Sequence, residues 1–391
     1  MNPSNTMKST TYWKKLSALM LASSLTVVGT VAFLPSNVSV AQAAISSTHR
    51  STSAIQVQVE GKAVHTQGML SHTGKLLVPL KDVAKATGAS VTYNAKTHII
   101  SVKQGELLAT YEVYSGTGDD GVYVSFNGGT VGDAYESQII KGLSYVDIKA
   151  LSETFGYRAL WSHTNRTVNL TKDGVNQVAV TPTTLNTLST NSNLIIHMVY
   201  PVVSGLDNAA AQASINQALK DHYDQFLSAM LKQTHPSGAS AKMDESAEID
   251  GGYKVTYNQN GVISFLLTNY LLNGSAKGDD TLTGMTFSLK DGKLIQLDDI
   301  LKSNPNYRHD LKKLLQDDIR KHGDEMMVSL KQFNQLSTSS SDYLNNFYLT
   351  DQGFTVCFSK YAIGPGAAGH PEFAFTFRQL LKSGNPLRSY S

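Results

Sequence analysis

Leu76-Leu77-Val78-Pro79-Leu80-Lys81 begins a pattern that returns 68 positions later as Ser144-Tyr145-Val146-Asp147-Ile148-Lys149. Each copy then runs on to a glycine, Gly88 in the first and Gly156 in the second, with no gap in the spacing. A repeat of this kind predicts two matching stretches of backbone that share a core. It requires no reacting group, so the pattern indicates a scaffold.

Each copy is predicted to fold as a hairpin, a short helix and a second hairpin. Residues 55–61 alternate apolar and polar side chains, as a half-buried strand does, and end in a turn. The helices are expected to end at Gly88 and Gly156, because glycine adopts positive φ at the lowest cost. Tyr93 and Trp161 hold equivalent places in the second hairpins, and both are predicted to lie in the core.

The first half of the chain resembles the N-terminal domain of copper amine oxidases. The motif Leu77-Val78-Pro79-Leu80 with the Gly88 stop carries the resemblance, which covers residues 55–172 as two repeats, about 55–110 and 122–172. It is weaker in the second copy, where Asp147 replaces the proline. The resemblance implies an accessory module of exported bacterial proteins, and the name implies no oxidase activity.

Residues 1–43 are predicted to be a signal peptide. Three lysines precede the apolar run 16–34, and Ala41-Gln42-Ala43 supplies small residues for cleavage before Ala44. The alternative is an uncleaved membrane anchor, which the serines, threonines and glycine of the run disfavour. We therefore expect a secreted or wall-associated protein.

The composition indicates in which compartment the protein works and which partners it does not bind. Cys357 is the only cysteine, so no intrachain disulfide forms, which suits a Gram-positive bacterium better than a eukaryotic secretory route. Cys357 lies in an alternating apolar stretch and is predicted to be a buried, inert thiol. Without the lysines of the leader the formal charge is −1, and no concentrated basic face indicates nucleic-acid binding.

The second half, residues 193–382, is predicted to be a separate domain after a linker over 173–192. The linker is rich in Thr, Asn and Ser. Beyond it, Asn260-Gly261 and Asp291-Gly292 predict hairpins, and Asp207 is a candidate cap for an amphipathic helix. The predicted fold class is α+β: a duplicated strand, helix and hairpin module followed by antiparallel hairpins packed on helices.

A second resemblance covers about residues 190–382. The hairpin of residues 347–354 and the loop Tyr361-Ala362-Ile363-Gly364-Pro365-Gly366-Ala367-Ala368-Gly369, followed by Phe373, resemble the extracellular domain of RsiV-type anti-sigma factors and PdaC-type peptidoglycan deacetylases. The resemblance implies recognition of a wall ligand or of a protein such as lysozyme. The chain has neither a sigma-binding segment nor a deacetylase domain, which weakens a signalling or hydrolytic role.

Two metal-dependent chemistries lack their ligands in the sequence. Copper amine oxidation needs three histidines and a modified tyrosine, but no His-x-His pair is present, and Tyr270 in Asn269-Tyr270-Leu271 is predicted to be packed. Thr117-Gly118-Asp119-Asp120-Gly121 matches a deacetylase motif by letters, yet no histidine pair follows it. A solvated turn between the repeats explains it better. We predict no cofactor, metal site or catalytic residue.

The remaining polar clusters divide into carboxylate pairs and a loop. Asp298-Asp299 and Asp317-Asp318 adjoin predicted helices, where capping or a solvated face explains them. The loop is the candidate ligand-binding site, because loops carry function disproportionately. Its candidate residues are Tyr361, Pro365, Gly369, His370, Glu372 and Phe373.

These observations favour a non-catalytic exported envelope protein that binds a wall polymer or an extracellular protein. One alternative is a peptidoglycan-acting hydrolase or deacetylase-related enzyme with separated carboxylates such as Asp298 and Asp317. Another is a purely structural envelope module. The sequence identifies neither the ligand nor the oligomeric state.

Overall fold

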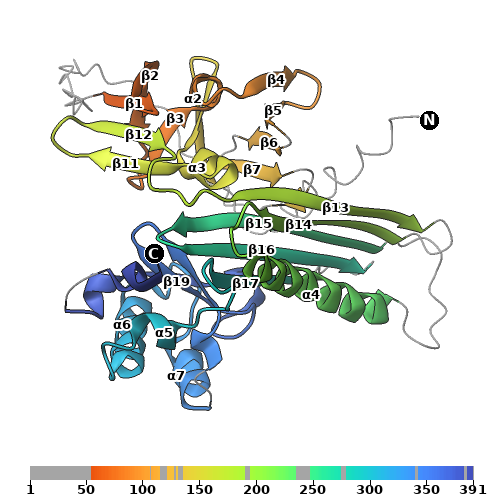
Figure 1. Ribbon diagram of the computed structural model, residues 1–391, viewed down its shortest axis with the longest axis vertical. Helices are drawn as coiled ribbons and strands as arrows, with labels where there is room; N and C mark the ends of the chain where they lie inside the picture. The colour runs from red at the N-terminus through yellow and green to blue at the C-terminus, as the bar shows by residue number, and fades with distance from the viewer. Residues whose placement is uncertain are drawn as a thin grey trace, which may run out of the picture. The chain divides into compact units, whose positions relative to one another are not determined.

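Figure 1 shows the chain as a computed structural model. The structure describes residues 54–105, 107–114, 121–126, 129–130, 135–189, 194–234, 247–273, 279–339, 342–382 and 385–390. The predicted signal peptide, 1–43, and Thr117-Gly118-Asp119-Asp120 lie outside these residues. No helix in the described ranges is both long and apolar enough to cross a bilayer.

The duplicated module has the predicted order of elements in both copies. The first copy consists of β1 (Ile55–Val59), β2 (Lys62–Leu70), β3 (Leu76–Pro79), α2 (Leu80–Ala86), β4 (Ser90–Asn94) and β5 (Ile99–Gln104). The second consists of β7 (Gly121–Phe126), β8 (Gly129–Thr130), β9 (Tyr135–Ile140), β10 (Leu143–Asp147), α3 (Lys149–Phe155), β11 (Arg158–Ser162) and β12 (Thr167–Thr171). An additional strand, β6 (Leu107–Tyr114), connects them.

The two copies interlock in one sheet. Its order is β11-β12-β1-β2-β3-β10-β9-β7-β6-β5-β4, with β8 beside β7. At its centre β3 and β10 run antiparallel and Val78 pairs with Val146, its equivalent 68 positions later. The second hairpin of each copy lies at the outside of the sheet, close to the first strand of the other copy. β12 of the second copy pairs in parallel with β1 of the first, and β5 of the first copy is separated from β7 of the second only by β6. The copies therefore depend on each other for strand pairing.

The predicted helix ends are confirmed. Gly88 follows α2 with φ +83° and Gly156 caps α3 with φ +67°. The left-handed conformation at these positions ends each helix and directs the chain into the second hairpin.

The predicted burial of Tyr93 and Trp161 is wrong. Tyr93 is 59% exposed and Trp161 is 38% exposed. Tyr93 pairs with Ile100 and Trp161 with Val168, and both partners are buried, so alternation identified the correct face of each strand. The rings lie near the hairpin turns, where too little of the core remains to cover a large side chain.

The predicted linker over 173–192 contains a strand. β13 (Ala179–Ser189) pairs along its length with β14 (Leu194–Ser204), so threonine-rich alternation was mistaken for a linker. These strands form one side of a five-stranded sheet, β13-β14-β15-β16-β17, with α4 (Ala209–Thr234) against it (Figure 1). The other strands are β15 (Ala247–Gln259), β16 (Val262–Asn273) and β17 (Asp279–Ser288).

Two turn predictions in this half have different outcomes. Asn260 and Gly261 have φ +55° and +68°, as the predicted two-residue hairpin between β15 and β16 requires. Asp291-Gly292 does turn the chain back: the Ser288 amide donates to Lys293 O at 3.0 Å, and the Ile295 amide donates to Thr286 O at 2.8 Å. The returning segment makes a single bridge, Leu294 to Phe287, in place of the predicted strand, and Leu297 already begins α5. Asn208 caps α4 in place of Asp207, since its side-chain oxygen accepts from the amides of residues 210 and 211.

The rest of the chain packs helices on a small sheet. The helices are α5 (Leu297–Leu301), α6 (Tyr307–His322) and α7 (Leu330–Ser339). The sheet has the order β18-β19-β20 and contains β18 (Phe347–Thr350), β19 (Gly353–Cys357) and β20 (Glu372–Thr376). The fold is α+β, with mostly antiparallel sheets.

The hydrophobic cores do not follow the predicted domain boundary. One cluster joins the duplicated module to the five-stranded sheet and α4, while a second lies among α5, α6, α7 and the small sheet. Phe126 of the module meets Tyr253 of β15 edge to face, with ring centroids 5.4 Å apart. Lys254 lies 3.9 Å from Glu153. The two halves therefore share packing within residues 51–391, which form one compact unit.

Candidate functional site

Four polar side chains form a line across the five-stranded sheet. His197 of β14 pairs with Asp250 of β15, Asp250 with Tyr270 of β16, and Tyr270 with Asp280 of β17. Residues directly opposite each other in a sheet project from the same face, so the register brings all four together. We call these residues the polar row.

The polar row occupies the face opposite the one that α4 covers. Its sequence neighbours Ile196, Ile249 and Leu271 are buried in the cluster that includes Ile215 and Leu219 of α4. Side chains alternate between the faces of a strand, so the row residues project the other way. All four are partly accessible to solvent.

One end of the polar row is acidic and partly buried. His197 Nδ1 lies 3.6 Å from Asp250 Oδ2, and Glu248, two residues before Asp250, projects from the same face. Burial raises the pKa of Glu248, as does the charge of Asp250, while His197 opposes the shift. Burial also raises the pKa of Tyr270, with smaller contributions from Glu248 and Asp280.

The other end of the polar row meets the glycine loop, which we define as residues 359–371. Lys360 Nζ lies 2.5 Å from Asp280 Oδ1, and His370 Nε2 lies 3.1 Å from Asp280 Oδ2. His370 Nδ1 lies 3.2 Å from the carbonyl oxygen of Phe358. Both ring nitrogens of His370 thus face acceptors, an arrangement that the doubly protonated imidazolium satisfies best.

The pKa shifts in this ion-pair cluster reinforce one another. Burial alone would raise the pKa of Asp280, but hydrogen bonds from His370 and Lys360 lower it to about 2. Burial disfavours the charged form of His370, yet its hydrogen bond to Asp280 and the charge of that carboxylate raise the pKa above its usual value. The cluster therefore stabilises the protonated imidazole of His370 and the ionised carboxylate of Asp280 together.

The glycine loop is closely packed and presents one exposed aromatic ring. Tyr361 has φ +66° and is 59% exposed. Its ring packs on Gly366, where an added Cβ would lie 2.5 Å from the Tyr361 Cε1. An added Cβ at Gly364 would meet the carbonyl oxygen of Met327 at 2.5 Å, and the Ser329 amide donates to Ile363 O at 2.7 Å. The loop thus holds Tyr361 against a fixed support.

The structure divides the predicted loop residues into exposed and internal sets. Tyr361 and Pro365 are exposed, whereas His370 is largely buried against Asp280. Glu372 points toward Tyr348 Oη, at 3.4 Å, and Cys357 Sγ, at 3.6 Å. Gly369 has φ +61° and contributes backbone geometry alone.

The prediction that Phe373 forms part of the ligand-binding surface is wrong. It is 1% exposed and meets Phe358 edge to face at 5.7 Å. Its place in β20, paired with Val356, directs the ring into the core. Phe373 therefore supports the loop from beneath and does not present a surface to a ligand.

Sequence reasoning missed the polar row because its members are separated along the chain. His197 and Asp250 are 53 positions apart, and only the parallel pairing of β14 with β15 brings them together. Tyr270 was predicted to be packed, yet it stands on the partly open face. An accurate strand register was the only signal that would have identified the row.

The other chemical candidates are engaged in local structure. Asp298 accepts from Tyr307 and from Arg308 Nη2, the latter at 2.6 Å, and Asp299 completes a capping box with Gln296. Asp317 pairs with Arg320 at 2.5 Å. Cys357 is buried, as predicted. Among the described residues, no group of three or more His, Cys, Asp or Glu could hold a metal ion.

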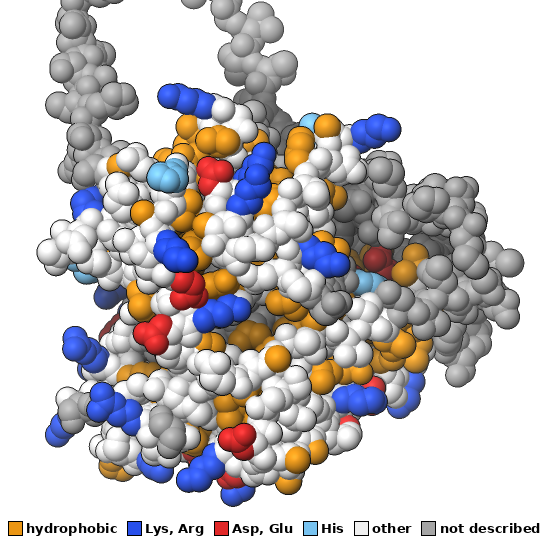
Figure 2. Space-filling model, turned by 45° about the horizontal axis from the view of Figure 1, so that its top comes forward, with side chains coloured by type: hydrophobic (Ala, Val, Ile, Leu, Met, Phe, Trp, Pro, Cys, Tyr) orange, Lys and Arg blue, Asp and Glu red, His pale blue; other side chains and the backbone are white. Residues whose placement is uncertain are grey.

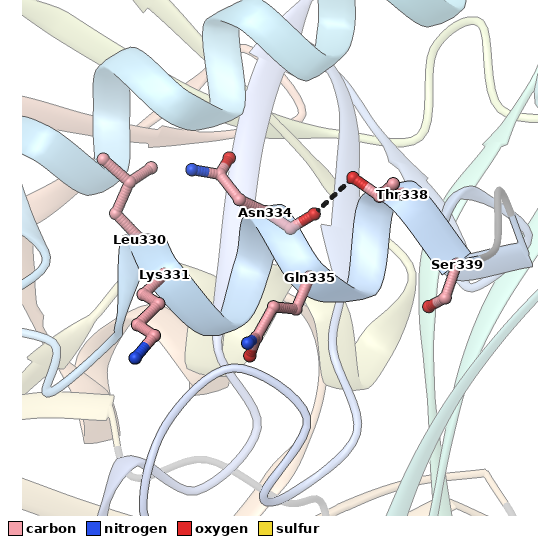
Figure 3. A pocket seen from close by; sticks show the side chains of 6 residues that line it. All are labelled: Leu330, Lys331, Asn334, Gln335, Thr338 and Ser339. Atoms are coloured by element: carbon pink, nitrogen blue, oxygen red, sulfur yellow. Dashed lines mark hydrogen bonds between the residues drawn. The ribbon is translucent and has the colours of Figure 1, made fainter.

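An open depression of about 710 Å³ follows one face of α7 (Figure 3). Lys331 is its only charged lining residue. The hydroxyl of Thr338 donates to Asn334 O at 2.7 Å and is thereby engaged within the helix. The depression offers no convergent polar groups, so the polar row and the glycine loop remain the better candidate site.

Three family models match successive parts of the chain. Residues 58–170 match the copper amine oxidase N-terminal domain, residues 188–279 match deacetylase PdaC, and residues 298–378 match a protein family of unknown function, DUF3298. These matches confirm the predicted tandem module followed by RsiV/PdaC-type sequence. The domain types are those of extracellular, envelope-associated proteins.

Two solved structures are similar to part of this chain. A DUF3298 family member from Bacteroides fragilis is 17% identical, covers 56% of this chain and 98% of its own, and has a TM-score of 0.40. A DUF3298 family protein from Pseudomonas aeruginosa is 15% identical, covers 53% of this chain and 92% of its own, and has a TM-score of 0.32. No curated protein matches the chain significantly.

Proposed function

We propose that this chain, which joins a copper amine oxidase N-terminal domain to PdaC-type and DUF3298-type sequence, is a non-catalytic exported binding protein of the cell envelope. Its ligand-binding surface comprises the glycine loop and the adjoining end of the polar row. The ligand is a wall polymer or an extracellular protein, with a lysozyme-like protein suggested by the anti-sigma resemblance. A Gram-positive envelope suits the predicted leader and the lack of disulfides.

The observation that carries the proposal is the support given to Tyr361. A tyrosine in the left-handed region costs on the order of 1 kcal/mol relative to ordinary backbone. The loop nevertheless holds this residue there and keeps its ring exposed on Gly366. A fixed, exposed tyrosine offers contact area at little loss of side-chain entropy, which is why such residues recur at binding surfaces.

The neighbouring charges give the surface a polar side. Lys360 Nζ lies 6.0 Å from the centre of the Tyr361 ring and also pairs with Asp280. A partner that contacts Tyr361 would therefore also meet the Lys360 and Asp280 pair. Because this pair is only partly buried, it favours orientation and specificity over a large gain in affinity.

A Tyr361→Gly variant tests this proposal without disturbing the fold. Glycine accepts the same φ, so the thermal unfolding midpoint should remain within the change expected for about 1 kcal/mol. Capture of hen lysozyme and sedimentation with purified peptidoglycan should be measured for both proteins. Loss of either interaction in the variant supports the proposal, whereas capture and sedimentation equal to the parent protein remove the loop as the binding surface.

The competing function is a wall hydrolase that uses Asp298 and Asp317. Each carboxylate already accepts a hydrogen bond from an arginine. Neither belongs to a group of three or more His, Cys, Asp or Glu that could hold a metal ion among the described residues. These contacts favour structural roles. Activity on peptidoglycan is the direct discriminator between the two functions.

A further inference from the structure

The hairpin tips of the duplicated module carry the same pair of side chains. Tyr93 Oη and His98 Nδ1 are 2.8 Å apart, and Trp161 Nε1 donates to His163 Nδ1 at 3.0 Å. All four side chains are exposed. Each copy thus holds an aromatic ring beside an imidazole at the edge of its core.

The two tips match in backbone and in composition. His98 and Arg166, which are 68 positions apart, both adopt positive φ, +58° and +47°. Residues 93–98 and 161–166 each contain one aromatic residue, one histidine, one threonine, one asparagine, one cation and no carboxylate. The two histidines are not at equivalent positions: His98 corresponds to Arg166, and His163 corresponds to Ala95. Simple duplication of the sequence therefore does not account for the repeated pair of an aromatic residue and a histidine.

The geometry of each pair leaves a ring and a polar atom accessible. The ring centroids are 6.3 Å apart at 52° in the first tip and 5.8 Å apart at 89° in the second. Trp161 Nε1 can only donate, so His163 accepts through Nδ1 and, when neutral, carries its proton on Nε2. Neither His98 nor His163 forms a hydrogen bond through Nε2 to a residue that the structure describes.

We propose that the two hairpin tips are a pair of equivalent binding sites for an acidic glycan. The face of a pyranose ring is apolar enough to stack on Tyr93 or Trp161, while its hydroxyl groups need donors and acceptors such as an imidazole Nε2. Lys96 and Arg166 supply the single cation of each tip, which would pair with a carboxylate on the sugar.

The size and placement of the tips favour a polysaccharide over a protein or a membrane. The view in Figure 2 shows hydrophobic side chains reaching the surface among scattered basic, acidic and histidine side chains. The tips connect β4 to β5 and β11 to β12, and β4 and β11 lie at the two ends of the strand order. Two small, matching, separated contacts suit a polymer with a repeating unit, because linked sites strengthen binding through effective concentration.

Tryptophan fluorescence can test each tip separately. The chain has two tryptophans, Trp13 and Trp161, so Trp13→Phe in the full chain makes Trp161 the only reporter. We expect the disaccharide N-acetylglucosaminyl-N-acetylmuramic acid to shift the Trp161 emission saturably, and the neutral disaccharide N,N′-diacetylchitobiose to bind several-fold more weakly. Adding Trp161→Phe and Tyr93→Trp moves the reporter to the first tip, where the same behaviour is expected.

Sedimentation with peptidoglycan tests the cooperation of the two tips. Tyr93→Ala or Trp161→Ala alone should weaken binding about tenfold or more, because a single remaining site no longer gains from the effective concentration of a linked second site. The double variant should lose binding. Tyr123→Ala is the control, since Tyr123 is also exposed but stacks on Tyr114. Lys96→Gln with Arg166→Gln should reduce binding of the acidic disaccharide to the level of N,N′-diacetylchitobiose.

Failure of this proposal is distinguishable from failure of the glycine loop. Tyr361→Gly should leave the Trp161 titration unchanged, because it lies outside the duplicated module. An unchanged Trp161 emission at millimolar disaccharide would overturn the glycan proposal. So would a fluorescence shift obtained with phosphatidylglycerol vesicles and not with the disaccharide.

Discussion

His370 and Asp280 are 90 positions apart in the chain, yet His370 Nε2 lies 3.1 Å from Asp280 Oδ2. The contact fastens the glycine loop to the end of β17, where the polar row ends. Lys360 approaches the second oxygen of the same carboxylate. The loop that carries Tyr361 is therefore secured by charge as well as by packing.

The His370 and Asp280 pair should make stability depend on pH. The raised pKa of His370 stabilises the fold fully below its unfolded value of 6.5, and this contribution is lost as pH rises through the folded value. The lowered pKa of Asp280 acts in the other direction, with stability lost as pH falls from 3.8 toward about 2. His370→Gln should therefore cost about 1 kcal/mol near pH 5 and less near pH 9. Urea unfolding at both values measures this.

His309→Gln is the matched control for that measurement. His309 is an exposed histidine of α6. Its replacement measures what the loss of an exposed imidazole does to the free energy of unfolding, against which the cost of His370→Gln is compared. A cost of His370→Gln that is the same at both values would show that His370 is not charged in the fold.

Gly88→Ala and Gly156→Ala should destabilise the module by similar amounts. Both glycines have positive φ, and an added Cβ would meet nothing within 4 Å at either position. The cost is then the backbone penalty alone, about 1 kcal/mol each. Thermal unfolding of the two variants measures it, and a large difference between them would contradict the equivalence of the two helix ends.

Gly284→Ala should be much more damaging. Its φ is unremarkable, but an added Cβ would lie 1.9 Å from the carbonyl oxygen of Phe347 at the start of β18. The small sheet packs against β17 through this close approach, so the methyl group would force the two apart. We expect a loss of more than about 3 kcal/mol in urea unfolding. A cost no larger than that of Gly88→Ala would show that β18 does not pack closely there.

Cys357 should remain unreactive in the folded protein. Its side chain is 1% exposed within β19. A thiol reagent such as Ellman's reagent should therefore modify it only as fast as the surrounding sheet opens, and rapidly in urea. Rapid labelling of the native chain would contradict this burial.

Local signals in the sequence predicted the repeat, the α+β class and most turns. The 68-residue spacing identified β3 and β10, and Asn260-Gly261 identified the turn between β15 and β16. What the sequence could not predict is pairing between distant strands. Parallel pairing of β1 with β12 has no local cause, and it decides how the two copies share a core.

The candidate site was predicted only in part for the same reason. The glycine loop has a distinctive composition, which identified Tyr361 and His370. Asp280, the partner of His370, gave no local signal because it belongs to a strand 90 positions earlier. Phe373 was misjudged because an aromatic residue after a loop has the same sequence signal whether it is buried or exposed.

Burial on a strand face also proved to depend on position along the strand. Tyr93 and Trp161 project from the same faces as the buried Ile100 and Val168, but they lie where the hairpins leave the core. The alternation of apolar and polar residues predicts the face from which a side chain projects, but it does not predict how far other residues cover that side chain. Their exposure is the basis of the glycan proposal.

We propose that this protein binds in the envelope without cutting or deacetylating its ligand. Purified protein should be incubated with peptidoglycan, with and without a chelator, while sedimented protein, new reducing ends and free acetate are measured. We expect the protein to sediment with the walls while reducing ends and acetate remain at the level of a protein-free control. Time-dependent release of sugar ends or acetate that requires the protein would contradict it.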